Sequence, residues 1–406
     1  MKHFKDIFRT FLTLLLLLPA DFLLAENSVT VSPADNVETT AVSDPMDSVE
    51  VSLITCSPHE EIYSLYGHTA LRWHETGDTP RDIAFNYGVF DFKRPHFILR
   101  FVFGITDYEL GAYPFDLFCA EYARWGCQVS EQVLNLTNAE KRKLRDALAE
   151  NLRPENRVYR YNFLYNNCST KPRDLIELCL DSELKYEERD DFNPTFREMI
   201  HEHTLRHPWA AFGNDLLLGV RADMKTNRRE QEFLPENLMY DFGHARIVDS
   251  TGVRPLVSNN RVVLMPGVQM VKSDFPLSPT ECALLLALVS LAVIFYEYHH
   301  RRTLVWWDAL LMLFTGAAGV VILAMFFSQH PTTSTNLQLL LLNPLPLFFL
   351  PAVLRRRPTR WWTISAVLLG AFLVGGAWQD YAEGTEIVAL CLLTRIWSNY
   401  RYAKQQ

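Results

Sequence analysis

The sequence predicts an α+β domain outside the membrane, followed by a C-terminal domain of transmembrane helices. Strand-like and helix-like segments succeed one another over residues 51–276, and long apolar runs dominate the remainder. Arginine and lysine are confined to alternate connections between these runs, as in helical membrane proteins. The hydrophobic fraction of 49% and the net charge of -8 therefore average two unlike domains. Nothing in the chain is basic enough to predict a nucleic-acid partner.

The N-terminus has the three parts of a secretory signal. Residues 1–25 combine a basic start, an apolar core at Phe11–Leu18 and a small-residue cleavage site at Ala25. An uncleaved anchor is the alternative. Residues 26–50 are rich in Ser, Thr, Asp and Pro without periodicity, which predicts a flexible tether.

Five C-terminal segments are candidate spans, each close to the roughly 20 apolar residues that a membrane helix needs. They are Leu277–Tyr296, Leu304–Phe327, Leu337–Leu354, Trp361–Trp378 and the weaker Tyr381–Trp397, which carries two glutamates and an arginine. The connections at 298–302 and 355–360 are basic, and those at 328–335 and 379–384 contain no lysine or arginine. By the positive-inside rule the basic connections are cytoplasmic. Residues 26–276 then lie outside, and 399–406 form a cytoplasmic tail. A helical membrane domain indicates an inner or plasma membrane, because outer-membrane spans are β-barrels. A buried bundle of a soluble protein is the weaker alternative.

The exported part, residues 51–276, is long enough for one α+β domain with a C-terminal extension. Thr137 and Glu140 form a capping box that opens a helix through Leu152. Strands are expected at 51–56, 64–73, 83–92, 97–103, 108–113 and 128–136, and within 245–266. Further helices are expected at 170–180 and 194–203.

Cys168 is the cysteine with an activating context. It lies where an aromatic extended run, 158–165, gives way to an apolar helical pattern. Unpaired N–H groups and the positive end of the helix dipole lower a thiol pKa at such a position and favour the nucleophilic thiolate. A buried, inert cysteine is the alternative. Five cysteines are exported, and the odd number leaves at least one thiol unpaired in an oxidising compartment. Cys119 and Cys127 are near enough to pair, as Cys56 and Cys179 might be over a longer distance.

A thiolate nucleophile needs a base, and the base needs a group that orients it. His68 follows a glycine on a predicted strand and is the candidate base, with His74 as a competitor. Asn86 on the next strand is the candidate orienting group, with Asp91 and Asp107 as competitors. The chain has no Cys-x-x-Cys and no His/Cys cluster at metal-ligand spacing, so neither a metal nor another cofactor is expected.

The order His68, Asn86, Asn167-Cys168 at a helix start resembles the circularly permuted papain-like hydrolases and acyltransferases, of which lecithin–retinol acyltransferase-type enzymes are the best known. The chain more closely resembles the Lnb family of bacterial lipoprotein N-acyltransferases, over nearly its whole length. The matching segments are 53–58, 63–72, 85–92, 161–175, 208–215 and 233–235, together with the helical tail.

The resemblance implies transfer of a phospholipid acyl chain, through a thioester on Cys168, to the amine of the lipidated N-terminal cysteine of a lipoprotein. The phospholipid donor, the lipoprotein and the membrane are then the expected partners. Asn167 and Tyr66 are candidate oxyanion donors, and Arg72 and Arg173 are candidate phosphate ligands, with salt-bridged arginines as the alternative. A cysteine peptidase or amidase acting on cell-wall peptides is the rival enzyme, and a non-catalytic sensor or scaffold is the third alternative.

Overall fold

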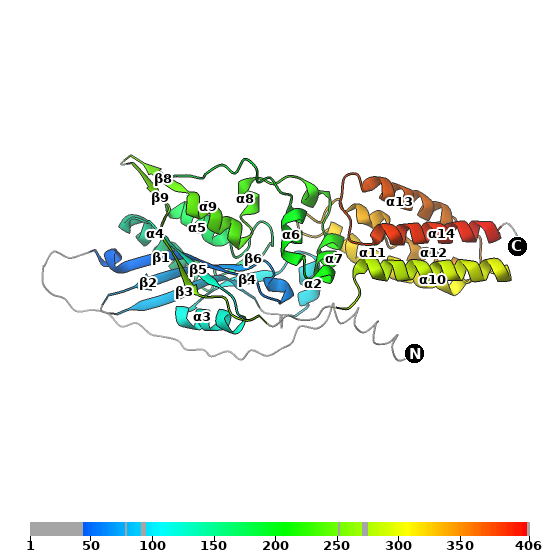
Figure 1. Ribbon diagram of the computed structural model, residues 1–406, viewed down its shortest axis with the longest axis horizontal. Coiled ribbons are helices and arrows are strands. Elements are labelled where there is room, and N and C mark those ends of the chain that lie inside the picture. The colour runs from blue at the N-terminus through cyan, green and yellow to red at the C-terminus, as the bar shows by residue number, and fades with distance from the viewer. Residues whose placement is uncertain (1–43, 78, 91–94, 251, 270–274, 404–406) are drawn as a thin grey trace.

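The computed structural model describes residues 44–77, 79–90, 95–250, 252–269 and 275–403. The exported part lies at one end of an elongated molecule, and a bundle of long helices lies at the other (Figure 1). The predicted signal segment, 1–25, and most of the predicted tether fall outside the described residues. The end of that tether belongs to the folded domain, because a 3-10 helix, η1 (Pro45–Ser48), precedes β1 and buries Met46.

A seven-stranded antiparallel sheet forms the centre of the exported domain. Its order is β10-β5-β1-β2-β3-β4-β6. The strands are β1 (Val49–Cys56), β2 (His68–Glu75), β3 (Arg81–Val89), β4 (Asp107–Pro114), β5 (Val129–Leu134), β6 (Val158–Arg160) and β10 (Val257–Leu264). A second sheet of three short strands contains β7 (Glu183–Lys185), β8 (Arg246–Asp249) and β9 (Gly252–Pro255).

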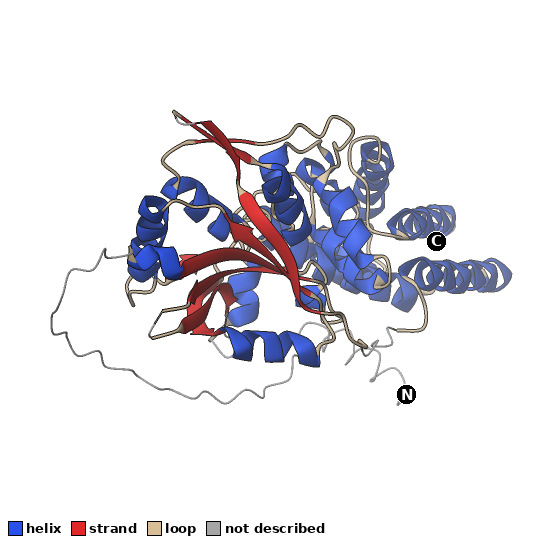
Figure 2. Ribbon diagram, turned by 60° about the vertical axis from the view of Figure 1, so that its left-hand side comes forward, coloured by secondary structure: helices blue, strands red, loops and turns tan. Residues whose placement is uncertain are grey.

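Helices cover both faces of the large sheet (Figure 2). Alternating residues of β1 and β2, such as Leu53 and Leu71, pack against α4 (Asn138–Asn151), α5 (Thr170–Cys179) and α9 (Pro235–His244). Residues of the opposite parity, such as Ile54 and Ala70, pack against α3 (Phe115–Arg124). This period of two is what a sheet buried on both faces requires.

A third hydrophobic cluster lies on the membrane side of the domain. It is built from α6 (Phe196–Thr204), the turn before α5 and the residues around Phe233. The remaining helices of the exported domain are α2 (Phe97–Val102), α7 (Pro208–Leu217), the 3-10 helix η3 (Val220–Asp223) and α8 (Arg228–Gln231). The capping box predicted at Thr137 is present at the start of α4. The strand expected at 97–103 is wrong, because this segment forms α2.

The C-terminal helices are α10 (Pro279–His300), α11 (Val305–Phe326), α12 (Leu345–Leu354), α13 (Trp361–Gly375) and α14 (Thr385–Ala403). Three segments of the described chain, α10, α11 and 337–354, are long and apolar enough to cross a membrane, and α13 is apolar but shorter. The third segment is interrupted between the 3-10 helix η4 (Leu337–Leu340) and α12. A Cβ at Gly319 of α11 would lie 2.2 Å from the Asn343 carbonyl carbon, so this glycine lets the interruption pack closely.

Arg395 ties α14 into the bundle. Its guanidinium donates to both carboxylate oxygens of Glu297, at 2.8 and 2.9 Å, and to both of Asp308, at 2.9 and 3.1 Å. All three side chains are buried, and burying a charge requires such partners. Arg395 is one of the charged residues that weaken the prediction of the fifth span. In the structure it forms buried ion pairs that hold α14 in the bundle.

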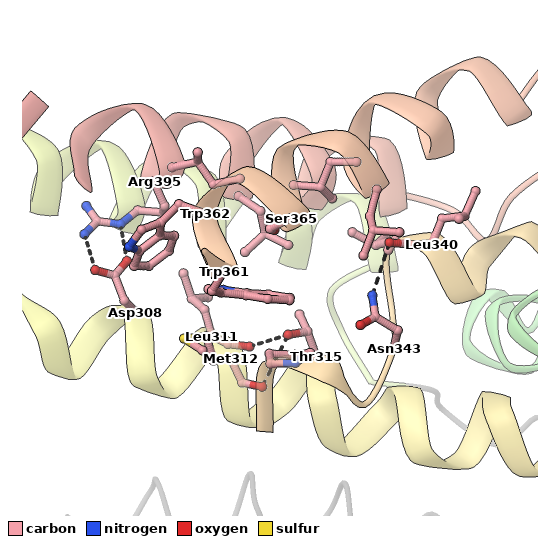
Figure 3. A pocket seen from close by; sticks show the side chains of 16 residues that line it. Asp308, Leu311, Met312, Thr315, Leu340, Asn343, Trp361, Trp362, Ser365 and Arg395 are labelled. Carbon is pink, nitrogen blue, oxygen red and sulfur yellow. Dashed lines mark hydrogen bonds and ion pairs between the residues drawn. The ribbon is translucent and has the colours of Figure 1, made fainter. Parts of the chain in front are cut away.

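A small cavity of about 30 Å³ lies beside this ion-pair cluster, between Asp308, Trp361, Ser365 and Arg395 (Figure 3). A space of this size holds one or two water molecules at most.

Candidate active site

Cys168 lies in a turn that leads directly into α5, as the sequence predicts. Asn167 shapes this turn. Its Oδ1 accepts hydrogen bonds from the backbone N–H groups of Ser169, at 2.9 Å, and Thr170, at 3.0 Å, and so caps the helix. Its Nδ2 donates to the carbonyl oxygens of Phe163 and Phe233, both at 2.8 Å. The thiol therefore sits on a rigid turn before the helix.

Two residues of neighbouring strands face this turn. His68 begins β2, and its Nε2 lies 2.8 Å from Oδ1 of Asn86 on β3. Nδ2 of Asn86 donates to the Tyr113 hydroxyl at 2.8 Å, and its Oδ1 also accepts from the Gly88 N–H at 2.7 Å. The amide oxygen is an acceptor only, so Nε2 of His68 carries the proton, and Nδ1 is the nitrogen left to accept a proton from Cys168.

Two glycines lie close to His68. A Cβ at Gly88 would lie 2.5 Å from Cε1 of His68, so a side chain there would displace the imidazole. Gly67, directly before His68, has φ +73, and a Cβ there would lie 2.7 Å from the Cys56 carbonyl oxygen. A side chain at Gly67 would therefore strain the backbone that leads into His68.

The surroundings favour a charged pair between the thiol and the imidazole. Burial raises the pKa of the Cys168 thiol, but the charge and hydrogen bond of His68 outweigh it, with further hydrogen bonds from the Thr69 N–H and the Ser169 hydroxyl. The pKa of Cys168 is therefore below its usual value. Burial opposes protonation of His68, but the charge and hydrogen bond of Cys168 raise the pKa of the imidazole above its usual value. The two shifts have opposite directions, so each group favours the charged form of the other.

Aromatic rings surround this pair. The Tyr122 ring stacks on the His68 ring with centroids 6.3 Å apart. On the Cys168 side, Tyr108 and Tyr161 stack at 3.9 Å, and Phe90 stacks on Tyr108 at 4.7 Å. Burial, and then the Cys168 charge, raise the pKa of the Tyr108 hydroxyl. Asn162, directly after Tyr161, pairs with Asn166 in the turn before Cys168, so this row of rings lies near the thiol.

The four predicted substrate-binding residues have the following partners in the structure. Both amide hydrogens of Asn167 bind carbonyl oxygens, so its side chain has no donor left for an oxyanion. The Tyr66 hydroxyl accepts from Asn214 Nδ2 at 2.7 Å, which ties it to α7.

The ion pairs of the two arginines agree with the alternative of salt-bridged side chains, and the phosphate role stays a prediction. Arg72 binds Asp82 at 2.6 Å and Glu131 at 3.1 Å, with its guanidinium 4.0 Å from the Phe115 ring centroid. Arg173 is only 4% exposed and binds Glu232 at 3.0 Å. Their charges are already neutralised by buried carboxylates.

The competing residues lie elsewhere. His74 is six positions along β2 from His68, about 20 Å at the usual rise of a strand. Asp107 pairs with Arg100 and Arg160, and Asp91 falls outside the described residues.

The cysteine pairs considered from the sequence are not formed: all seven cysteines, which lie within the described ranges, are free. Among the described residues, no group of three or more His, Cys, Asp or Glu side chains is arranged to hold a metal ion.

Sequence reasoning missed Thr69, Ser169, Gly88 and Tyr113. Thr69 and Ser169 are also linked to each other, with their hydroxyl oxygens 2.8 Å apart. Gly88 follows Asn86 by two positions and so shares its strand face, which is the one signal in the sequence that points to it.

Fold and site together define a membrane-bound α+β protein whose exported domain contains a Cys-His-Asn arrangement. Residues 37–202 match the family model of the Lnb N-terminal periplasmic domain, and residues 270–406 match that of the Lnb transmembrane domain. The chain belongs to the Lnb family of membrane enzymes that modify lipoproteins, and it is a membrane protein with a periplasmic domain. Searches of curated proteins and of solved structures found no match.

Proposed function

We propose that this chain is a cysteine-dependent lipoprotein N-acyltransferase of the inner membrane. Cys168, His68 and Asn86 are its catalytic residues, a phospholipid is the acyl donor, and the lipidated N-terminal cysteine of a lipoprotein is the acceptor. The observation that carries the proposal is the contact of the Cys168 thiol with His68, whose Nε2 is held by Asn86 at 2.8 Å. Membership of the Lnb family supports a lipoprotein as the acceptor.

The first half-reaction forms a thioester. The Cys168 thiolate attacks the carbonyl carbon of a phospholipid ester, and the backbone N–H of Cys168 at the turn before α5 stabilises the tetrahedral oxyanion. The intermediate collapses with cleavage of the ester C–O bond. The departing lysophospholipid oxygen takes the proton from the His68 imidazolium.

The second half-reaction forms the amide. The α-amine of the lipoprotein cysteine, with a pKa of about 8 when unperturbed, attacks the thioester carbonyl. His68 takes the proton of the amine, the C–S bond breaks, and Cys168 leaves as a thiolate. Asn86 keeps the proton on Nε2 throughout, so that Nδ1 remains the nitrogen that exchanges protons with substrate.

Attachment to the membrane favours lipid substrates over soluble peptides. Buried amides of the membrane domain bind carbonyl oxygens of α7 and of the residue after it: Gln338 Nε2 to Asp215 at 2.6 Å, Asn336 Nδ2 to Leu216 at 2.8 Å and Gln379 Nε2 to Leu218 at 2.9 Å. A peptidase tethered by a single helix would not need such a junction. The exported domain is thereby held at a fixed height over the bilayer, where both proposed substrates reside.

The test is N-acylation of a diacylated lipoprotein by purified protein in phospholipid vesicles. We expect Cys168→Ala to abolish product while the protein still accumulates and unfolds at the wild-type temperature. Cys119→Ala, which removes a half-exposed thiol on α3, is the matched control and should retain activity. Full activity in Cys168→Ala would exclude the proposal, and release of peptide fragments from cell-wall material would favour the amidase.

A further inference from the structure

Helix α2 exposes large apolar side chains on a domain that otherwise lies in water. Leu99 is 56% exposed, Phe101 is 46% exposed, and Phe103, directly after the helix, is 42% exposed. Single exposed apolar residues are ordinary, but Leu99 and Phe103 are four positions apart and share one face of the helix, and Phe101 adds a third exposed side chain to the same short segment.

Contacts with the end of α11 fix the height of this segment. The Gln329 N–H donates to the Phe103 carbonyl oxygen at 3.0 Å, and Nε2 of His330 lies 2.9 Å from the Phe101 carbonyl oxygen. Gly104, with φ +67, allows the approach, since a Cβ there would lie 3.1 Å from the Gln329 backbone. Helix α2 accordingly lies at the end of the exported domain next to the membrane helices (Figure 1).

The length of α11 locates this height relative to the bilayer. Its 22 residues, at about 1.5 Å each, extend about 33 Å, against a hydrocarbon core of about 30 Å. Its end therefore reaches the interface between acyl chains and headgroups. Phe327, directly after α11, is 73% exposed at the same level. Short amphipathic helices bury their apolar side about 5–10 Å into this interface.

Polar contacts hold the other side of α2 against the domain. Arg100 binds Asp107 at 2.6 Å, and Arg160 binds Asp107 at 2.7 Å and Oε1 of Gln329 at 2.9 Å. This network connects α2 to β4, β6 and the connection after α11. It fixes the orientation in which Leu99, Phe101 and Phe103 remain uncovered.

The same segment leads to the thiol. Phe103 is five residues before Tyr108 on β4, the Tyr108 ring stacks on Tyr161, and Asn162 pairs with Asn166 two positions before Cys168. A row of aromatic rings thus connects the chain after α2 with the turn that carries the candidate nucleophile.

We propose that α2 inserts Leu99, Phe101 and Phe103 into the membrane leaflet on the exported side, and that a phospholipid acyl chain passes from there along Tyr108 and Tyr161 to Cys168. Bilayer lipid is the occupant of the exposed face of α2. Only the delivery to Cys168 rests on the proposed function.

The insertion is tested in a variant that lacks the candidate nucleophile and therefore does not depend on catalysis. A full-length chain with Cys119→Ser and Cys168→Ser carries an environment-sensitive fluorophore on Leu99→Cys, in phosphatidylethanolamine–phosphatidylglycerol vesicles with or without brominated acyl chains. The same chain without Leu99→Cys gives the background. The control label is on Val253→Cys, which is 61% exposed in β9 at the far end of the exported domain (Figure 1).

We expect brominated chains to quench the label on Leu99→Cys strongly and the label on Val253→Cys not at all. Equal, weak quenching at both positions would overturn the insertion. Blue-shifted emission that bromine does not quench would also overturn it, because protein would then cover the helix.

The delivery is tested by the double variant Leu99→Gln, Phe101→Gln. We expect KM for vesicle-embedded phospholipid to rise about tenfold or more, since the apolar insertion is lost. Thioester formation from a dissolved short-chain ester should not change. A KM equal to that of Val253→Gln would overturn the delivery. If bromine quenches the label on Leu99→Cys but the wild-type protein never acquires an acyl group on Cys168, the proposed function is refuted and the insertion of α2 still holds.

Discussion

His68 determines the reactivity of Cys168, because burial alone would keep the thiol protonated. With the imidazole present, the pKa of the thiol lies below its usual value, so the thiolate forms at lower pH than in a free cysteine. We expect the rate of Cys168 alkylation by iodoacetamide to rise with pH through that lowered pKa. In His68→Ala, only the hydrogen bonds of Thr69 and Ser169 still oppose the effect of burial, and the midpoint should rise. An unchanged midpoint would show that His68 does not contact the thiol in solution.

Gly88 is a second test at the residue scale. In Gly88→Ala, the new methyl group would meet the His68 ring at 2.5 Å, so the imidazole must leave Asn86. We expect kcat to fall by much of the roughly 10²–10⁴-fold contribution of a positioned general base, with little change in KM. Gly213→Ala is the matched control, since a Cβ there has no neighbour within 4 Å. Loss of activity in the control as well would remove the steric explanation.

Sequence reasoning could find the site residues that lie at a recognisable helix start or on a predicted strand. Cys168 precedes a helix, and His68 and Asn86 lie on adjacent predicted strands. The sequence does not decide between a phosphate role and a salt bridge for Arg72 and Arg173, because their partners Glu131 and Glu232 lie about sixty residues away in the chain. Thr69 and Ser169 carry no sequence signal, since their contact with the thiol arises from packing of α5 on β2.

At the scale of elements, Asn167 is the residue that holds the start of α5 in place. Its oxygen caps two N–H groups and its nitrogen binds two carbonyl oxygens. We expect Asn167→Ala to lower the free energy of unfolding by about 2–4 kcal/mol, from a lost cap and unsatisfied buried groups. Asn167→Asp keeps the cap but turns a buried carboxylate oxygen toward the two carbonyl oxygens, so chemical denaturation should show at least as large a loss. Equal stability of Asn167→Ala and wild type would contradict this role.

Two segments have a structure that differs from the one their sequence pattern predicts, and both lie near or within the membrane domain. The segment 97–103 resembles a strand because aromatic and β-branched residues dominate it, yet it forms α2 at a surface where tertiary contacts override local propensity. The third predicted span is interrupted because Asn343 packs against Gly319, a contact between distant segments.

At the scale of the whole molecule, the catalytic proposal depends on a thiol held at a fixed distance from lipid. Positive-inside charge patterning predicts which side the domain is on, and the family match agrees with a periplasmic domain. The buried contacts of Asn336, Gln338 and Gln379 with the residues around α7 were not predictable, because amides in membrane-domain connections carry no signal of their partners.

The most direct measurement is the intact mass of the full-length protein after incubation with a defined phospholipid, before and after hydroxylamine. The account predicts a mass gain of one fatty-acyl group that maps to Cys168, disappears with hydroxylamine and is absent from Cys168→Ala. Wild type without an adduct, together with a His68 variant that also traps none, would contradict acyl transfer through Cys168.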